Sequence, residues 1–298
     1  LFETRSRQHM DGLFGQYVPP DLVKEMSRDP ENYSLASQKR ELSVLFTDIR
    51  SFTTISEGLE ADELSTLMDE YLTPMTRIVH ETQGTIDKYI GDAVMAFWGA
   101  PVFHPHHADQ AVGGGMAMLT ALEELNEDFA EKGWPEIRIG VGVNTGMMSV
   151  GNMGSAFRRA YTVLGDAVNQ GSRLEGITKA YGVDFIVSEA TAKAAGRYAY
   201  RELDRVRVKG KEKPVTILEP IGLIEELTLI QKNKIDSFDR FLFLYRSQHW
   251  DRALADLEKM REAQGDCLLF DLYQERIEHF RENPPGEDWD GVFVHTSK

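Results

Sequence analysis

A short apolar run that ends in a carboxylate places the strongest constraint on how this chain folds. Residues 43–53 read SVLFTDIRSFT, so apolar side chains give way at Asp48 to hydroxyl residues and then to an amphipathic helical pattern. This pattern indicates a buried strand, followed by a loop and a helix start whose free N–H groups suit phosphate. We therefore expect Asp48 to lie at the carboxyl end of a buried strand.

A second Asp repeats this arrangement further along the chain. Residues 89–97 read YIGDAVMAF and put Asp92 at a Gly-led hairpin tip between two apolar runs. Taken singly, either Asp is compatible with a role as a cap or turn residue. Taken together, the two carboxylates favour a site that holds a pair of Mg²⁺ ions against a nucleotide.

Composition limits the class of protein. A chain of 298 residues with 42% hydrophobic content can form one large domain and a smaller one. Its net charge of −15 argues against a nucleic-acid partner, which requires a basic face on the protein. The single Cys267 rules out an internal disulfide and predicts a cytoplasmic location. No segment approaches the roughly 20 apolar residues that a membrane span needs.

The spacing of apolar residues predicts a mixed fold. Helical spacing is found over residues 61–82, 108–129 and 166–181. Extended patterns cover residues 85–90, 93–98, 137–145, 148–151, 161–164, 185–187, 198–208 and 215–220, with a tight turn expected at Gly146. Hairpins are too frequent for a doubly wound sheet. We therefore expect an α+β fold with an antiparallel-rich sheet covered by helices.

The chain divides into three regions. Residues 1–40 predict a helical lead-in and linker, residues 41–222 a catalytic domain, and residues 223–298 a helical appendage. Within the appendage, helices are expected over residues 235–246, 250–263 and 268–281. One helical hairpin of tetratricopeptide type cannot bury its own apolar face. We therefore expect the appendage to pack on the main domain or on a partner.

Three segments together resemble the class III nucleotidyl cyclase catalytic domain. They are FTDIRSFT at 46–53, DKYIGD at 87–92 and YTVLGDAVNQGSR at 161–173. The resemblance covers roughly residues 41–220 and implies a ferredoxin-like βαββαβ core. It also implies a homodimer whose subunits pair head to tail and share each active site.

A narrower likeness links the chain to bacterial membrane-anchored sensor adenylate cyclases. It rests on QYVP at 16–19 and DWDGVF at 288–293. The chain also begins at Leu1 without an initiator Met. The expectation is a piece of a longer parent with an upstream sensor region, anchored in the inner (plasma) membrane with this domain on the cytoplasmic side.

The resemblance implies roles for residues in the subunit that holds the metal. Asp48 and Asp92 would bind two Mg²⁺ or Mn²⁺ ions, and the backbone carbonyl of Ile49 would complete the ligand set. The amides around Ser51, Phe52 and Thr53 would meet the terminal phosphates of the nucleotide.

Other roles fall to residues of the second subunit. Lys88 and Thr162 would contact the purine edge, Asn169 would orient the ribose, and Arg173 would face the reacting phosphorus. Asn169 and Arg173 are four residues apart and so share one face of a helix. Lys209, in the segment Val208–Lys211, matches a triphosphate contact.

Base choice rests on Lys88 and Thr162. A Lys can donate to N1 of adenine, and a hydroxyl can accept from its 6-amino group, whereas guanine presents N1–H and a carbonyl. ATP is therefore favoured. Many adenylate cyclases have Asp at the position of Thr162, and because Thr can donate or accept, the rejection of GTP is weaker here. Met147 also departs from the family pattern, since some members carry a phosphate-binding Arg there.

The resulting hypothesis is a homodimeric adenylate cyclase that forms 3′,5′-cyclic AMP and pyrophosphate from ATP in signal transduction. Three alternatives remain at this point. The chain could be a guanylate cyclase, a catalytically silent domain that binds nucleotide to relay a signal, or an interaction scaffold built on the helical appendage.

Overall fold

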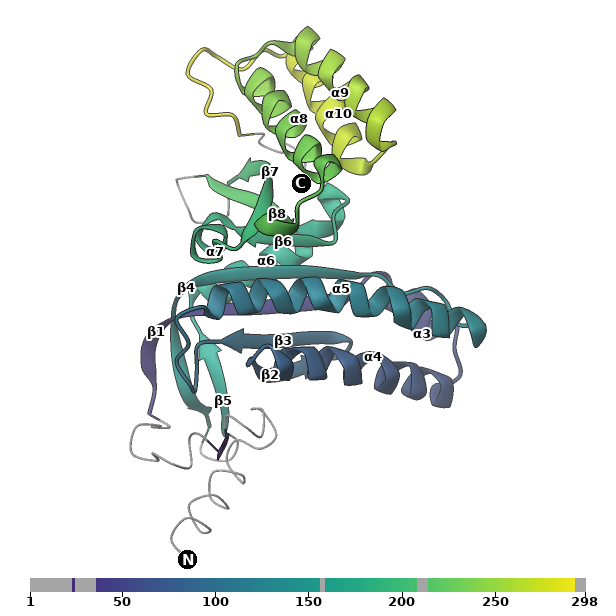
Figure 1. Ribbon diagram of the computed structural model, residues 1–298, viewed down its shortest axis with the longest axis vertical. Helices are drawn as coiled ribbons and strands as arrows, with labels where there is room; N and C mark the ends of the chain where they lie inside the picture. Colours follow the sequence, from purple (N-terminus) through teal and green to yellow (C-terminus); the bar gives the residue numbers. More distant parts are fainter. Residues whose placement is uncertain (1–22, 25–35, 156–158, 208–213, 293–298) are drawn as a thin grey trace, which may run out of the picture.

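The computed structural model describes residues 23–24, 36–155, 159–207 and 214–292. One open sheet organises the fold (Figure 1). Its strands are β1 (Gln38–Ile49), β2 (Thr85–Ile90), β3 (Ala93–Trp98), β4 (Ile139–Gly154), β5 (Arg159–Leu164), β6 (Phe185–Ser188), β7 (Tyr198–Val206) and β8 (Val215–Leu223). They lie in the order β2-β3-β1-β4-β6-β8-β7, and β5 pairs with β4. All paired strands are antiparallel except β4 and β6.

Helices cover the sheet, and further helices follow its last strand at the carboxyl-terminal end of the chain. They are α3 (Phe52–Glu57), α4 (Ala61–Glu81), α5 (His107–Glu131), α6 (Asp166–Tyr181), α7 (Glu189–Ala194), α8 (Leu229–Arg246), α9 (Trp250–Gln264) and α10 (Leu268–Glu282), with a short 3₁₀ turn η2 (Ile224–Glu226). The predicted α+β class with an antiparallel-rich sheet is confirmed.

The first part of the chain forms the expected ferredoxin-like unit. In sequence it runs β1, α4, β2, β3, α5 and β4, with α3 inserted after β1. In space the four strands lie in the order β2-β3-β1-β4, so β1 is central and pairs with both β3 and β4. This arrangement brings the end of β1 beside the turn that joins β2 and β3.

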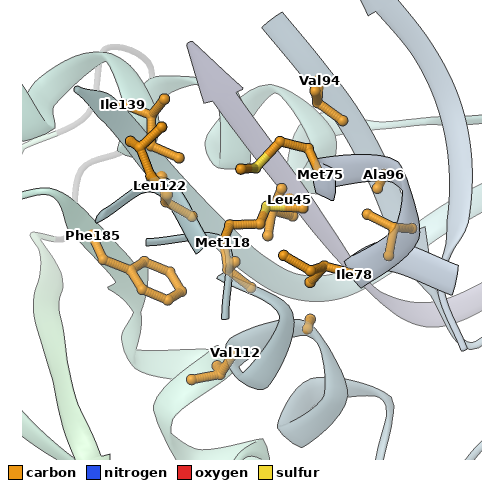
Figure 2. Packing of buried hydrophobic residues seen from close by; sticks show 14 of the residues in the cluster. Leu45, Met75, Ile78, Val94, Ala96, Val112, Met118, Leu122, Ile139 and Phe185 are labelled. Carbon is orange, nitrogen blue, oxygen red and sulfur yellow. The ribbon is translucent and has the colours of Figure 1, made fainter. Parts of the chain in front are cut away.

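The main core lies between this sheet and the helices α4 and α5. One stripe of α4 is buried, as its spacing predicted, and a capping box between Glu60 and Glu63 fixes its start. Figure 2 shows Met75 of α4 and Met118 of α5 packing near Leu45 of the central strand. Tight packing here fixes the position of β1, whose last two residues are Asp48 and Ile49.

The predicted turn at Gly146 is wrong. β4 is one continuous strand, and Gly146 pairs with Leu42 in the middle of the ladder with β1. A Cβ atom at Gly146 would lie 3.2 Å from the Cβ atom of Ala167 in α6. The glycine therefore serves close contact between strand and helix rather than a change of chain direction.

Helix α6 packs on the sheet face opposite to α4 and α5. A Cβ atom at Gly142 would lie only 2.2 Å from the backbone nitrogen of Glu175, and one at Gly171 would lie 2.9 Å from a methyl group of Val44. Gly142 lets the backbones of β4 and α6 approach closely, and Gly171 lets α6 lie against a side chain of β1. The position of α6 relative to β1 is thus set by the sequence of both elements.

The helices α8, α9 and α10 share an aromatic core and pack on β7 and on the end of α6 (Figure 1). Asp204 of β7 is buried at this contact. It accepts hydrogen bonds from the hydroxyl of Tyr181 at 2.6 Å and from Nη1 of Arg276 at 2.7 Å. The buried ion pair therefore joins α10 to β7, and the Tyr181 hydrogen bond links the carboxyl end of α6 to the same carboxylate.

The observed boundaries differ slightly from the predicted ones. β1 begins at Gln38, before the predicted strand segment that starts at Ser43, and the first appendage helix begins at Leu229 rather than Ile235. Most of the predicted lead-in over residues 1–40, with the segment 16–19, lies outside the described residues. None of the helices that the structure describes is long and apolar enough to cross a bilayer.

Candidate active site

The structure brings Asp48 and Asp92 together. Asp48 lies at the end of β1, and Asp92 lies in the turn between β2 and β3, where the backbone N–H of Ile49 donates to its Oδ2 at 2.9 Å. Partial burial, a hydrogen bond to Asp92 and the charge of Asp92 raise the pKa of Asp48 to about 6. Like charges at short range have this effect on a carboxyl group.

A third carboxyl group, Glu175 of α6, faces this pair and was not predicted. Burial raises the pKa of Glu175 to about 7, and the charge of Asp48 adds to the effect. Helical spacing could have indicated the position of Glu175, because it follows the buried Gly171 by one turn and precedes the buried Thr178. Its acidic side chain instead suggested an exposed face.

The donor set at this corner suits a hard divalent cation. Asp48 and Asp92 offer carboxylate oxygens, and their mutual repulsion is relieved by positive charge. Within the described ranges, no group of three or more His, Cys, Asp or Glu side chains is placed to hold a metal by itself. Mg²⁺ typically uses one or two protein carboxylates and completes its shell with substrate phosphates and water. The residues therefore fit such an ion.

The predicted phosphate loop follows Asp48 directly. α3 begins at Phe52 after Ser51, which adopts a left-handed conformation with φ of 58°. Ser51 and Thr53 are exposed, whereas Phe52 packs against the main core. The first N–H groups of a helix lack intrahelical partners. In the sequence, the amides at the start of α3 thus follow closely after Asp48.

Lys88 and Thr162 meet at a third residue, Asp87. The hydroxyl of Thr162 donates to Oδ2 of Asp87 at 2.6 Å, and Nζ of Lys88 lies 3.1 Å from Oδ1. Asp87 is buried, and sequence reasoning gave it no role although it lies in the quoted motif at 87–92. A β-bulge between Ile86 and Lys88 disturbs the ladder at this point.

Asn169 and Arg173 both lie on the exposed side of α6. Successive residues of an α-helix are about 100° apart, so Arg173 and Glu175 point in nearly opposite directions. Arg173 has no hydrogen bond or ion pair with the residues the structure describes. The structure therefore does not turn Arg173 toward the carboxylates of its own chain.

Two further predicted positions are Lys209 and Met147. Lys209 lies outside the described residues. Met147 lies on β4 with 58% of its surface exposed, and the sequence of β4 contains no Arg.

Comparison with known proteins gives the relatives of this chain. The family model for the adenylate and guanylate cyclase catalytic domain matches residues 35–218. Adenylate cyclase 1 of Rhizobium meliloti is 36% identical over 212 residues, which is 71% of this chain. The chain spans 32% of the length of that relative.

Solved structures with the same fold include cyclases of both base preferences. The adenylyl cyclase CyaB from P. aeruginosa is 35% identical with a TM-score of 0.60, and the match covers 65% of this chain and 100% of the other. The guanylyl cyclase Cya2 is 34% identical with a TM-score of 0.60, over 65% and 98% of the two chains.

Proposed function

The chain belongs to the adenylate and guanylate cyclase catalytic domain family, and on that premise we propose that it converts ATP into 3′,5′-cyclic AMP and pyrophosphate. The observation that carries this proposal is the pairing of Asp48 and Asp92 at one corner of the sheet. A role in signal transduction is part of the same proposal.

Asp48, Asp92 and the backbone carbonyl of Ile49 would hold the divalent cations, two Mg²⁺ or Mn²⁺ ions per site. When bound, such ions lower the pKa of an attacking hydroxyl and neutralise phosphate charge. The amides at Ser51–Thr53 would bind the terminal phosphates, and Lys209 would add a cation to the triphosphate. The chain then holds the leaving pyrophosphate at several points.

Arg173 would stabilise the charge that develops on the oxygens of the reacting phosphorus. A fixed guanidinium stabilises a transition state more than the ground state when the charge appears only during reaction. Asn169, on the same face of α6, would orient the ribose. Because Arg173 faces away from the carboxylates of its own chain, we propose that both residues act on the site of a second subunit.

Lys88 and Thr162 would contact the purine and favour ATP. A GTP-using enzyme is the second candidate, since Cya2 is a guanylyl cyclase of similar identity. The two candidates differ in the hydrogen bonds that Lys88 and Thr162 can make with N1 of the purine and with the group at its C6.

The test is turnover by the purified protein with ATP or GTP, in Mg²⁺ or Mn²⁺, measured as cyclic nucleotide and pyrophosphate. We expect cyclic AMP as the main product. Asp48→Asn should reduce the rate at least about 10²-fold, whereas Asp69→Asn on the exposed side of α4 should not change it.

Each other outcome selects a different function. Cyclic GMP as the main product would identify a guanylate cyclase. Nucleotide binding without turnover would identify a silent domain. A chain that neither binds nor turns over nucleotide, and whose binding to a protein partner survives Asp48→Asn, would be a scaffold.

A further inference from the structure

The carboxyl group of Asp87 accepts hydrogen bonds from two directions. Its Oδ2 receives the hydroxyl of Thr162 at 2.6 Å and the backbone N–H of Val163 at 3.3 Å. A backbone N–H can only donate, so Oδ2 acts as an acceptor. Nζ of Lys88 lies 3.1 Å from Oδ1 as an ion pair, although without the alignment of a hydrogen bond.

The single hydroxyl proton of Thr162 therefore points at Asp87. A hydroxyl has one proton to donate and two lone pairs that accept. Because the proton is used inside the chain, only lone pairs remain for a ligand. Thr162 is 7% exposed, so rotation of the hydroxyl is confined by its surroundings as well.

We propose that Asp87 sets the base preference of this site by making Thr162 an acceptor and holding Lys88 as a donor. This inference rests on the proposed function and specifies its substrate. The 6-amino group of adenine can donate to Thr162, and N1 of adenine can accept from Lys88. Guanine presents a carbonyl to the lone pairs and an N1–H to the ammonium, so both contacts are mismatched.

The bulge in β2 makes this arrangement possible. Neighbouring residues of a regular strand point to opposite faces of the sheet. Ile86 pairs with Ala96 and Lys88 pairs with Met95, so Asp87 is the extra residue of the bulge. A bulge redirects side chains locally, and here Asp87 and Lys88 come within ion-pair distance of each other. Asp87 then reaches Thr162 on β5 while Lys88 stays 47% exposed.

The experiment compares kcat/KM for ATP with kcat/KM for GTP in a set of variants. Asp87→Ala frees the Thr162 hydroxyl to donate, and we expect the ATP preference to fall about 10- to 100-fold, as one mispaired hydrogen bond would produce. Thr162→Ser keeps the hydroxyl and should keep the preference. Thr162→Val should lose it, and adding Asp87→Ala to Thr162→Val should change it little further.

Asp87→Asn is the second variant, because it keeps the size of the side chain. Its amide oxygen can still accept from Thr162 and from the N–H of Val163, and only the charge beside Lys88 is lost, so the ATP preference should fall less than in Asp87→Ala. A folded Asp87→Ala protein with the wild-type ATP preference would overturn the proposal, as would an Asp87→Asn protein that loses more of the preference than Asp87→Ala.

A binding measurement separates this proposal from the proposed function. The affinities of wild-type protein and the same variants for nonhydrolysable ATP and GTP analogues are measured by calorimetry. If wild-type protein turns over neither nucleotide, the proposed cyclase activity fails, and the ratio of the two affinities still tests Asp87. Equal ratios in wild type and Asp87→Ala would exclude the role given to this residue.

Discussion

Arg173 and Glu175 point away from each other, although only one residue separates them on α6. Glu175 lies near Asp48 and Asp92, whereas Arg173 is exposed. One helix thus presents a carboxyl group to the site of its own chain and a guanidinium to the surroundings. This relationship is the structural reason for proposing that two subunits complete each site.

Mixing two inactive variants tests that proposal. Asp48→Asn and Arg173→Ala should each lower cyclase activity about 10²- to 10³-fold. In an equal mixture, half of the dimers are mixed, and one of the two sites in each mixed dimer has both residues intact. The mixture should recover about a quarter of the wild-type activity.

Activity per molecule should also fall on dilution, because a dimer dissociates. If the mixture stays inactive while both variants fold and pair, the two residues do not serve one shared site.

The acid limb of the pH profile follows from the raised pKa values. Asp48 has a pKa of about 6 and Glu175 a pKa of about 7, so protons compete with a cation for this corner as the pH falls. We expect activity to drop as the pH falls through this range, and added Mn²⁺ to move the midpoint to lower pH. A midpoint that ignores the metal concentration would contradict the placement of the cation at Asp48.

The same pKa values predict a stability effect of Asp48→Asn. The pKa of Asp48 rises from 3.8 to about 6 on folding, so the folded protein binds more protons, and its free energy of unfolding falls as the pH rises through this window. With a chelator at pH 8, Asp48→Asn should raise Tm by a few degrees, since solvent screening limits the gain to about 1 kcal/mol.

The gain should shrink as the pH falls and vanish only below pH 3.8, where Asp48 is protonated in both the folded and the unfolded protein. Asp69→Asn, at an exposed position on α4, serves as the control and should leave Tm unchanged over the same pH range.

Gly142 should tolerate no side chain. A methyl group there would lie 2.2 Å from the Glu175 backbone, so Gly142→Ala must push α6 away from β4. We expect a loss of about 1–3 kcal/mol in the free energy of unfolding and a lower cyclase rate. Gly176, also on α6, has open space around it, and Gly176→Ala should be neutral or slightly stabilising. Equal effects would show that close packing at Gly142 does not position α6.

The appendage should depend on the buried Arg276–Asp204 pair. Arg276→Met leaves Asp204 buried with the hydrogen bond from Tyr181 but without a cation, at a cost of about 3–5 kcal/mol. The exposed pair between Arg281 and Asp251 provides a control, and Arg281→Met should cost less than about 1 kcal/mol. Urea unfolding measures both. Similar costs for the two variants would mean that the contact between α10 and β7 contributes little to stability.

Most of the fold follows from local patterns in the sequence. The helix over residues 166–181 and the hairpin strands over 85–90 and 93–98 have the predicted bounds. The helix has apolar residues at helical spacing, and Gly91 marks the turn between the two strands. Gly146 was misread because a glycine can permit a turn or the close approach of another backbone, and the two uses look alike in one strand.

The candidate site was predictable in part. The motifs indicated Asp48, Asp92 and the exposed face with Asn169 and Arg173, and the structure places the first two together. Asp87 and Glu175 were missed for different reasons. A bulge breaks the alternation from which strand faces are predicted, and a Glu on a helix suggests solvent rather than a neighbouring acid. The roles of these residues, and of Lys209, remain proposals.

The bulge at Asp87 has a consequence for how such a site can change. The bulge shifts the alternation of side chains in β2 by one residue, so the residues before it and after it alternate out of step with each other. Substitutions at Asp87 or Lys88 can therefore alter which purine is accepted while Asp92 keeps its bond to Ile49. The β2–β3 hairpin thus holds residues for the purine and a residue for the metal, and the two can change independently. A single deletion that restored the regular alternation of β2 would disrupt only the contact with the purine.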